Sequence, residues 1–221
     1  MKGVFITGTD TGIGKTYFTV ACIKALQTDG IKTVAMKPVA SGADLIDGQL
    51  RNEDAVLIQQ ALNHNVDYDL INPYAFEPPV SPHIAAAKAG VEIDVQIIQQ
   101  HYQRLIAGAE FVLVEGVGGW LAPLSHKLTV ADMAKAVDLP VVMVVGVRLG
   151  CLNHAMLTAQ AIVQSGQRLA GWVANIVEPE LNSADEQIDY ISQSLGMAPM
   201  VRQEWGQASP LCSTDLIRLA D

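Results

Sequence analysis

Three residues near the start of the chain have the types and spacing of a phosphate-binding loop. Gly14, Lys15 and Thr16 close the stretch GTDTGIGKT, which follows an apolar run of strand length at 3–7 and precedes a helical pattern from Tyr17. In that context main-chain amides wrap a phosphate, the lysine reaches the terminal phosphates and the threonine hydroxyl ligates Mg²⁺. The stretch therefore predicts a site for a nucleotide and its magnesium ion.

The glycines of this loop depart from the usual spacing by one residue. With Gly14 and Lys15 fixed, the first glycine belongs at position 9, which is Thr9, and Gly8 comes one residue early. We interpret the segment as a variant loop with five intervening residues. The alternative, a glycine-rich turn that ends in Lys-Thr by coincidence, fits the flanking strand and helix less well.

A lysine and a serine follow the second apolar strand. Lys37 ends the run 33–37, and the small, turn-rich segment after it contains Ser41. In an open parallel sheet this end of the strand faces the ligand crevice, so both side chains can face one bound group. A lysine in this position is otherwise an ordinary surface residue.

A carboxylate extends the candidate magnesium site. Glu115 ends the strand 111–114 and precedes glycines that permit close approach of a ligand. P-loop enzymes place an acidic group near the metal at such a strand end. The structural alternative is a glutamate held by nearby amides. Asp54 follows the candidate helix cap Asn52, and an acidic residue in a first turn usually serves the helix dipole.

The second half of the chain offers candidates for the base and the substrate. Asn175 ends the strand 169–176, and its amide suits an adenine edge, while Glu204 to Gly206 form a candidate base-side loop. Asn153 is expected to cap a helix that runs to about Ser165. Free amides at that helix start bind a carboxylate or serve ordinary capping, and the sequence leaves both open.

An α/β scaffold is needed to bring these residues together. The order strand, helix, strand over 3–37 makes the two strands parallel under the right-handed crossover rule. Strand-length apolar runs recur at 111–114, 140–147 and 169–176, with helical spacing at 52–62, 93–106, 129–137, 153–165 and 183–195. We expect one domain over 1–221, a Rossmann-like P-loop NTPase fold with a mostly parallel central sheet flanked by helices.

Three segments are expected to lack regular structure. Residues 43–50 show no periodicity and predict a mobile loop. The segment 72–83 contains four of the 10 prolines. Residues 197–221 look irregular apart from a helical pattern at 214–220.

Composition excludes several classes of function. A net charge of −9 with only 14 lysines and arginines disfavours binding to nucleic acid or anionic lipid. Three scattered cysteines indicate a reducing compartment, and no apolar run has the length of a membrane span. Because the chain enters a strand directly after Met-Lys, we expect no signal peptide and a cytoplasmic location.

Seven stretches together resemble the dethiobiotin synthetase family. They are TGTDTGIGKT at 7–16, KPVASG at 37–42, RNEDA at 51–55, NPYAFEPPVSPH at 72–83, VLVEGVGGW at 112–120, VVGVRLGCLNHAMLTAQ at 144–160 and GWVAN at 171–175. They span the chain in the family's order, and the part beyond Ile176 matches only loosely. The resemblance implies a homodimeric ligase that converts 7,8-diaminononanoate, CO₂ and MgATP to dethiobiotin, ADP and phosphate.

The resemblance also implies a role for each matching residue. Lys37 and Lys15 are catalytic, and the metal ligands are Thr16, Asp54 and Glu115. Substrate contacts are Ser41 and, across the dimer, Gly150, Cys151 and Asn153. Nucleotide contacts are Thr11, Gly12, Ile13, Gly14, Lys15, Thr16, Tyr17, Asp54, Glu115, Gly116, Val117, Gly118, Asn175, Ile176, Glu204, Trp205 and Gly206. Relatives carry Glu where this chain has Gly12, so no side-chain role carries over to that position.

Two other functions remain open on the sequence alone. A nucleotide switch of the ParA/MinD kind carries a lysine five residues before the P-loop lysine, where this chain has Asp10. A different amide-forming ATPase, acting on a larger carboxylate, is distinguished only by its substrate. For the implied reaction, we expect crowding by other cations to lower the pKa of Lys37, which would help it manage protons on the amine or carbamate.

Overall fold

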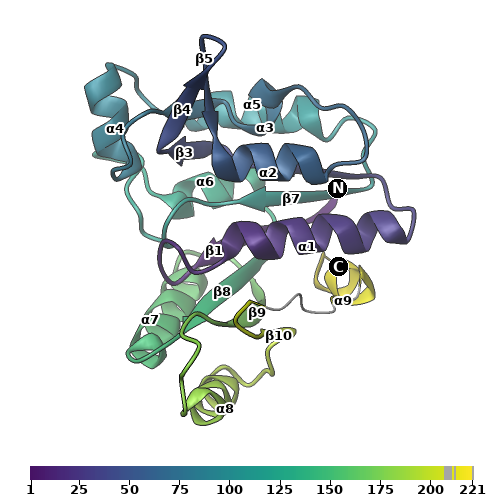
Figure 1. Cartoon of the computed structure of the whole chain (residues 1–221), viewed down its shortest axis with the longest axis vertical. Coiled ribbons are helices and arrows are strands. Elements are labelled where there is room, and N and C mark those ends of the chain that lie inside the picture. Colours follow the sequence, from purple (N-terminus) through teal and green to yellow (C-terminus); the bar gives the residue numbers. More distant parts are fainter. Residues whose placement is uncertain (207–210, 212, 221) are drawn as a thin grey trace.

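The computed structural model describes residues 1–206, 211 and 213–220, and its centre is a parallel sheet (Figure 1). Within the described part of the chain this sheet has six strands in the order β10-β9-β8-β1-β7-β2. Their bounds, in that order, are Val201–Gln203, Leu169–Ile176, Val141–Val147, Lys2–Gly8, Phe111–Glu115 and Thr33–Met36. Every pairing between neighbours is parallel, which confirms the predicted sheet. All six carboxyl ends therefore lie along one edge.

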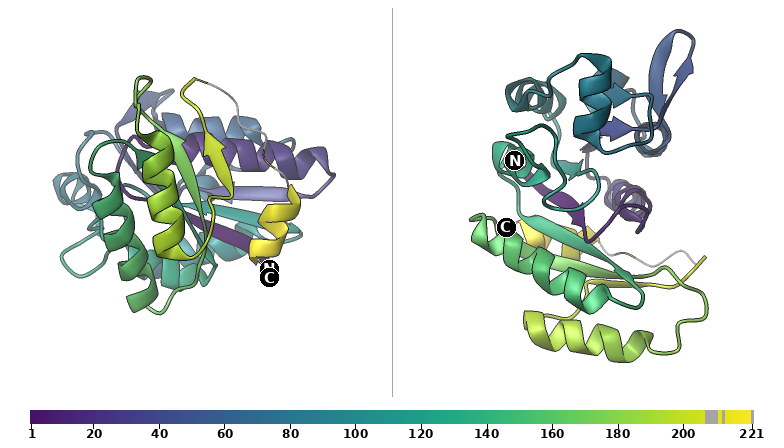
Figure 2. Two further views of the ribbon diagram at one scale, coloured as in Figure 1. Left: turned by 90° about the horizontal axis from the view of Figure 1, so that it is seen from below. Right: turned by 90° about the vertical axis from the view of Figure 1, so that its left-hand side faces the viewer.

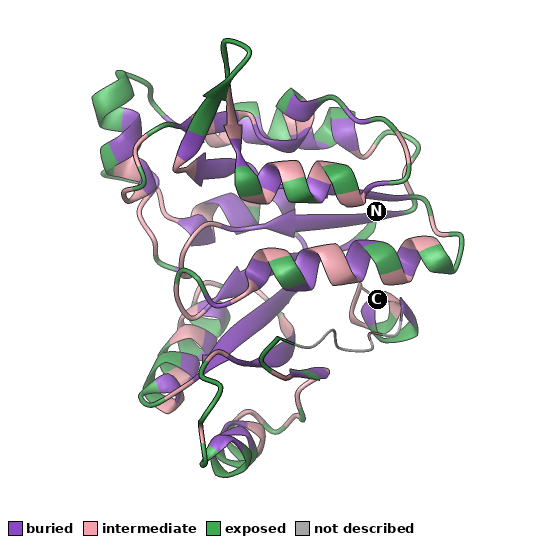
Figure 3. Cartoon of the chain, in the orientation of Figure 1, coloured by how far each residue is buried: buried purple, intermediate pink, exposed green. Residues whose placement is uncertain are grey.

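The strands are apolar because both faces of the sheet are covered. β8 is buried along its whole length, and β1 and β7 expose only Lys2 at one end (Figure 3). Continuous runs of valine, isoleucine and leucine are typical of parallel strands in this position. Close packing also requires Gly3, since a Cβ there would lie 2.4 Å from the Val112 carbonyl oxygen. The core thus forms a rigid base for the loops at the carboxyl edge.

Helices cover the two faces of the sheet. α1 (Lys15–Thr28) buries Phe18, Cys22 and Leu26, four residues apart, and lies on one face together with α9 (Ser213–Ala220). α6 (Val130–Val137) lies on the other face, as does α7 (Cys151–Gln164) (Figure 2). The remaining longer helices are α2 (Glu53–Ala61), α4 (Pro82–Ala89), α5 (Val95–Leu105) and α8 (Ala184–Leu195), and α3 (Tyr68–Ile71) is a single turn. No helix in the described residues is long and apolar enough to cross a membrane.

The expected irregular loop at 43–50 is instead a β-hairpin. β4 (Ala43–Ile46) and β5 (Gln49–Asn52) pair antiparallel and project from the body of the molecule (Figure 1). Asp47 and Gly48 both have positive φ, 50° and 77°, as a two-residue hairpin turn requires. The Asp-Gly dipeptide was the signal for this turn, and the lack of alternation around it concealed the strands.

Three other expectations about regular structure were wrong. The proline-rich segment contains β6 (Tyr74–Phe76), which pairs with β3 (Val39–Ser41), and its last proline begins α4. α7 begins at Cys151 after Gly150, whose φ of 92° requires glycine, so Asn153 lies inside the helix and does not cap it. The C-terminal part contains β10, a strand too short to show a pattern.

Candidate functional site

The P-loop spans the gap between β1 and α1 at the carboxyl edge of the sheet. Gly14 caps α1 with a φ of 89°, and a Cβ there would lie 2.3 Å from Nδ2 of Asn175. That amide donates to the carbonyl of Ile13 at 2.6 Å, which ties the loop to the end of β9. The helix therefore begins with its free amides facing the loop, the arrangement that receives a phosphate.

Lys15 lies over the P-loop and makes a contact within it. Its Nζ donates to the main-chain oxygen of Asp10 at 2.7 Å. Burial, assisted by the nearby Lys37 ammonium, lowers the pKa of Lys15 to about 8. The Asp10 carboxylate accepts from Arg148 at 2.6 Å, so the P-loop is also joined to the segment after β8.

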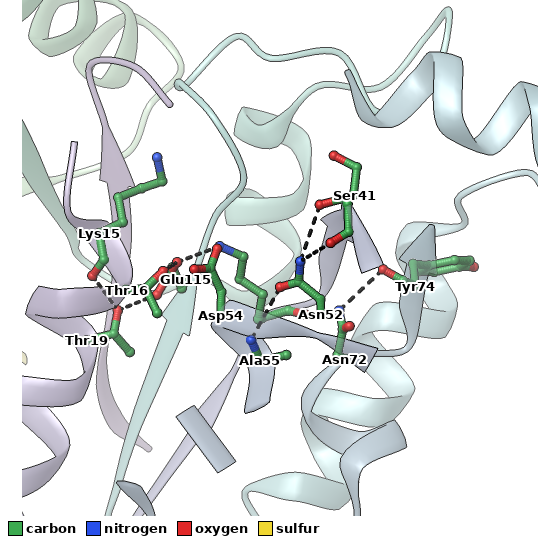
Figure 4. Close-up of polar contacts among 12 residues, drawn as sticks. Lys15, Thr16, Thr19, Ser41, Asn52, Asp54, Ala55, Asn72, Tyr74 and Glu115 are labelled. Carbon is green, nitrogen blue, oxygen red and sulfur yellow. Dashed lines mark hydrogen bonds and ion pairs between the residues drawn. The ribbon is translucent and has the colours of Figure 1, made fainter. Parts of the chain in front are cut away.

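Glu115 is the centre of the polar cluster below the loop (Figure 4). Its side chain is fully buried and accepts from the hydroxyls of Thr16 at 2.7 Å and Thr19 at 2.6 Å. It also accepts from Nζ of Lys37 at 2.6 Å. Strand β7 fixes this carboxylate from below, as its position at a strand end predicted.

Lys37 joins the two carboxylates of the site. Its Nζ lies 2.8 Å from Asp54 Oδ2 and 2.6 Å from Glu115 Oε1. Burial alone would lower the pKa of Lys37, but these two carboxylates raise it above its usual value. Burial likewise opposes ionisation of Asp54, yet the Lys37 ammonium lowers the pKa of that carboxyl. The expectation of a lowered pKa for Lys37 was wrong, because its nearest neighbours are anions.

The oxygen atoms of this cluster fit a magnesium ion. Mg²⁺ is usually held by one or two carboxylates together with waters and substrate phosphates. Thr16, Asp54 and Glu115 supply such oxygens, and the Lys37 ammonium satisfies the two carboxylates from within the chain. In the part of the chain that the structure describes, no group of three or more histidine, cysteine or acidic side chains forms a cage that would hold a metal by itself.

Two adjoining cavities bring most of the predicted residues together. The first, of about 240 Å³, is lined by Thr11, Gly12, Gly14, Lys15, Thr16, Lys37, Ala40, Ser41, Asn52, Asp54, Val117 and Gly118. The second, of about 690 Å³, is lined by Gly12, Ile13, Gly14, Tyr17, Arg148, Asn175, Ile176, Val177, Glu178, Gln203, Glu204, Trp205 and Gly206. Both cavities border the P-loop. The smaller has the position of a phosphate and substrate site, and the larger has the position of a base site.

Some predicted residues lie outside these cavities. Glu115 and Gly116 line neither: the Glu115 side chain is fully buried, and a Cβ on Gly116 would meet Val130 and Phe5. Gly150, Cys151 and Asn153 are also absent from the two linings; Cys151 is buried, with its thiol donating to Gln187 Oε1 at 2.9 Å.

Sequence reasoning missed several cavity residues. Gln203 was missed because β10 was not predicted, and Val177 and Glu178 because the strand before them was followed no further than Ile176. Arg148 directly follows β8, so its position at a strand end was a usable signal. Asn52 was predicted only as a helix cap, which it is, accepting from the amide of Ala55.

Sequence comparison relates the chain to one group of enzymes. A family model described as an AAA domain matches residues 2–202. The chain is 49% identical over 201 residues to the ATP-dependent dethiobiotin synthetase BioD of Xanthomonas oryzae pv. oryzae strain PXO99A, covering 91% of this chain and 90% of that one. It is 45% identical over 202 residues to the BioD protein of Aromatoleum aromaticum, covering 89% and 90%.

Comparison with solved structures concerns the fold alone. The MinC:MinD cell division protein complex of Aquifex aeolicus matches with a TM-score of 0.60 and 16% identity, covering 100% of this chain and 87% of that one. A ParA family ATPase from Chlorobium tepidum TLS matches with a TM-score of 0.52 and 13% identity, covering 93% and 85%. These likenesses confirm the P-loop NTPase architecture. They do not support the switch function, since identity this low carries only the fold.

Proposed function

We propose that this chain, which belongs to the dethiobiotin synthetase family, forms dethiobiotin, ADP and phosphate from 7,8-diaminononanoate, CO₂ and ATP with Mg²⁺. The observation that carries the proposal is the buried cluster in which Lys37 bridges Asp54 and Glu115 beside the P-loop. Around it, the two adjoining cavities match a nucleotide that extends from base to reacting phosphate.

The proposed reaction joins an amine, CO₂ and the second amine in three steps. One amine and CO₂ form a carbamate, which loses a proton and is a poor electrophile. Transfer of the γ-phosphoryl group to a carbamate oxygen then turns that oxygen into part of a leaving group. Attack by the second amine closes the urea ring and expels phosphate, with loss of another proton. Such a transfer needs positioning and positive charge more than covalent help from the protein.

The residues of the smaller cavity divide this work. Lys15 and Lys37 provide positive charge near the transferred group, and the P-loop amides hold its oxygens. The Ser41 hydroxyl faces the same cavity and is placed to orient the carbamate. Thr16, Asp54 and Glu115 would hold Mg²⁺, which supplies further neutralisation of phosphate charge when it is bound. Because Nζ of Lys37 lies within 2.8 Å of two carboxylates, we assign it charge stabilisation in this state.

The larger cavity is proposed as the nucleotide's base site. Asn175, Ile176 and the segment Glu204 to Gly206 line it, in support of their predicted role at the adenine. Asn175 uses its Nδ2 on the Ile13 carbonyl, so binding of the base would have to accommodate that contact. Glu204 is held by Arg202 at 2.6 Å.

The first experiment compares phosphate release with and without the diamine. Purified protein, MgATP and bicarbonate should release phosphate only when 7,8-diaminononanoate is added, and mass spectrometry should detect dethiobiotin. Diamines of other chain lengths and a longer carboxylate separate this activity from that of another amide-forming ATPase. Diamine-independent hydrolysis without product would support the switch function.

The role of Lys37 is tested by its neutral replacement. Lys37→Gln should lose most of the turnover and retain ATP binding, because the P-loop contacts stay intact. Lys135→Gln, at an exposed position of α6 that lines neither cavity, is the matched surface control. A fully active Lys37→Gln enzyme would contradict the assignment.

We further propose one domain over residues 1–221 and a cytoplasmic homodimer in which Gly150, Asn153 and the main chain of Cys151, whose side chain is buried, face the substrate of the partner. Support comes from apolar side chains exposed around α7: Leu149 at 91%, Leu157 at 57% and Val163 at 63%. Analytical ultracentrifugation tests the dimer. If residues 150–153 of one subunit complete the site of the other, a mixture of the Lys37→Gln and Gly150→Glu variants that can exchange subunits should recover part of the activity that each variant lacks.

A further inference from the structure

A chain of buried polar side chains runs behind the smaller cavity. Its members are Asn52, Tyr68 and Asn72, which are 6%, 5% and 3% exposed. The Tyr68 hydroxyl accepts from the main-chain amide of Asn52 at 2.8 Å and donates to Oδ1 of Asn72 at 3.0 Å. One hydroxyl thus uses both its donor and its acceptor capacity to join two segments of the chain.

Both ends of this polar chain hold main chain that carries proposed site residues. At one end, Nδ2 of Asn72 donates to the carbonyl of Lys37 at 2.7 Å. At the other, Nδ2 of Asn52 donates to the carbonyls of Ser41 at 3.3 Å and Gly42 at 3.4 Å (Figure 4). Asn52 also caps α2, the helix whose first turn contains Asp54. Lys37, Ser41 and Asp54 therefore share one set of supports.

The position of Tyr68 is itself fixed. The guanidinium carbon of Arg51 lies 4.0 Å from the centroid of the Tyr68 ring, and the single-turn helix α3 carries both Tyr68 and Ile71. The main-chain carbonyl of Ile71 in turn accepts from the main-chain amide of Lys37 at 2.8 Å. The ring packing does not involve the hydroxyl, so replacing tyrosine by phenylalanine cuts the two hydrogen bonds and leaves the ring contacts.

We propose that Tyr68 is a positioning residue that, through Asn52 and Asn72, sets the placement of Lys37 and Ser41 relative to Asp54 and thereby the rate of the chemical step. This inference rests on the proposed function for the identity of that step. Asn52 lines the smaller cavity, but none of the three residues of the polar chain touches the larger cavity proposed for the base, so we expect the contacts of the base to be unaffected by this chain. Displacements of about 1 Å at reacting groups cost up to roughly a hundredfold in rate, so losing the hydrogen bonds of one hydroxyl can lower the rate measurably.

The test compares Tyr68→Phe with Tyr74→Phe. Tyr74 is also a buried tyrosine: its main-chain carbonyl accepts from Nδ2 of Asn72 at 3.3 Å, but its hydroxyl, which the substitution removes, accepts from the main-chain amide of Asp94 at 3.0 Å and has no bond to the polar chain. Tyr68→Phe should lower kcat by roughly tenfold or more while the Kd for MgATP, measured by calorimetry, changes little. Tyr74→Phe should leave kcat near the native value. An unchanged kcat in Tyr68→Phe, or an equal drop in both variants, would overturn the proposal, as would a matching loss of ATP affinity.

A second readout does not depend on activity. Hydrogen exchange should quicken in the 37–42 segment of Tyr68→Phe and stay unchanged in the P-loop at 8–16, whereas Tyr74→Phe should alter neither. Asn72→Ala breaks the same chain of bonds, so Tyr68→Phe/Asn72→Ala should lose no more kcat than the worse single variant. If the native protein forms no dethiobiotin, the proposed function fails, and the exchange data still decide whether Tyr68 positions this segment. Unchanged exchange in Tyr68→Phe would refute the positioning role.

Discussion

Replacing Glu115 by glutamine should destabilise the protein strongly, because it leaves a buried ammonium with only one of its two anionic partners. Glu115 is fully buried and pairs with Lys37, which is itself almost fully buried. Removing one partner of a buried ion pair costs about 3–5 kcal/mol. The substitution keeps the side-chain shape, so its effect reports charge and hydrogen bonding more than packing.

The geometry places the expected cost at the lower end of that range. Lys37 keeps its bond to Asp54, whose side chain is 43% exposed and therefore screened. Thr19 also keeps a partner, because the Lys15 carbonyl, 3.0 Å from its hydroxyl, is an alternative acceptor to Glu115. We expect a loss of about 3 kcal/mol. For a chain of this length that corresponds to a fall of roughly 6–12 °C in Tm.

Urea unfolding followed by circular dichroism measures this loss. The exposed Glu77→Gln is the matched control and should stay within about 0.5 kcal/mol of the native protein. Adding Lys37→Met to Glu115→Gln should recover most of the lost stability, since removing a whole buried pair is close to neutral. If Glu115→Gln unfolds at the same urea concentration as Glu77→Gln, the Glu115 carboxylate does not stabilise the buried Lys37 ammonium as we infer.

Three further predictions concern other parts of the molecule. Gly14→Ala should weaken MgATP binding about tenfold or more in titration calorimetry, because its Cβ would clash with Asn175. Gly12→Ala is the control, since Gly12 also has positive φ but open space around its Cβ, so it shows the effect of backbone strain without a clash. Gly48→Val should cost about 1–3 kcal/mol in urea unfolding because β-branched residues avoid positive φ, whereas a Gly48→Asn protein as unstable as the valine variant would refute the turn geometry. Cys22 and Cys151 should resist iodoacetamide at pH 8 until urea is added, as burial raises the pKa of both thiols, and rapid native alkylation seen by peptide mass spectrometry would contradict this.

The central elements were predictable from the sequence because each carries its own local pattern. Apolar runs at 3–7 and 140–147 leave few alternatives to buried strands, and the P-loop glycines require a tight turn and then a helix after the first of these runs. Glu115 was placed near the loop from its position at the end of a strand, whereas Asp54 was assigned to the site only through the family resemblance. Parallel strands share a carboxyl edge, so these inferences needed no contact information.

The details that failed depend on partners distant in the sequence. The direction of the Lys37 pKa shift is set by Glu115, 78 residues away, and the single hydroxyl of Tyr68 gives no signal by itself. β10 is too short for its alternation to be noticed and is defined by its pairing with β9. Such features follow from contacts between residues distant in the sequence, which a short stretch of sequence does not reveal.

The placement of β10 divides the nucleotide site into an interior half and a peripheral half. The phosphate end rests on β1 and β7, each hydrogen-bonded to strands on both sides, whereas the base end borders β10, which among the described residues is a three-residue edge strand with one neighbour. A substitution near the phosphate disturbs the centre of the fold, but one in 203–206 disturbs only its margin. Substitutions in 203–206 should therefore alter the base end with less disturbance of the phosphate end than substitutions in β1 or β7.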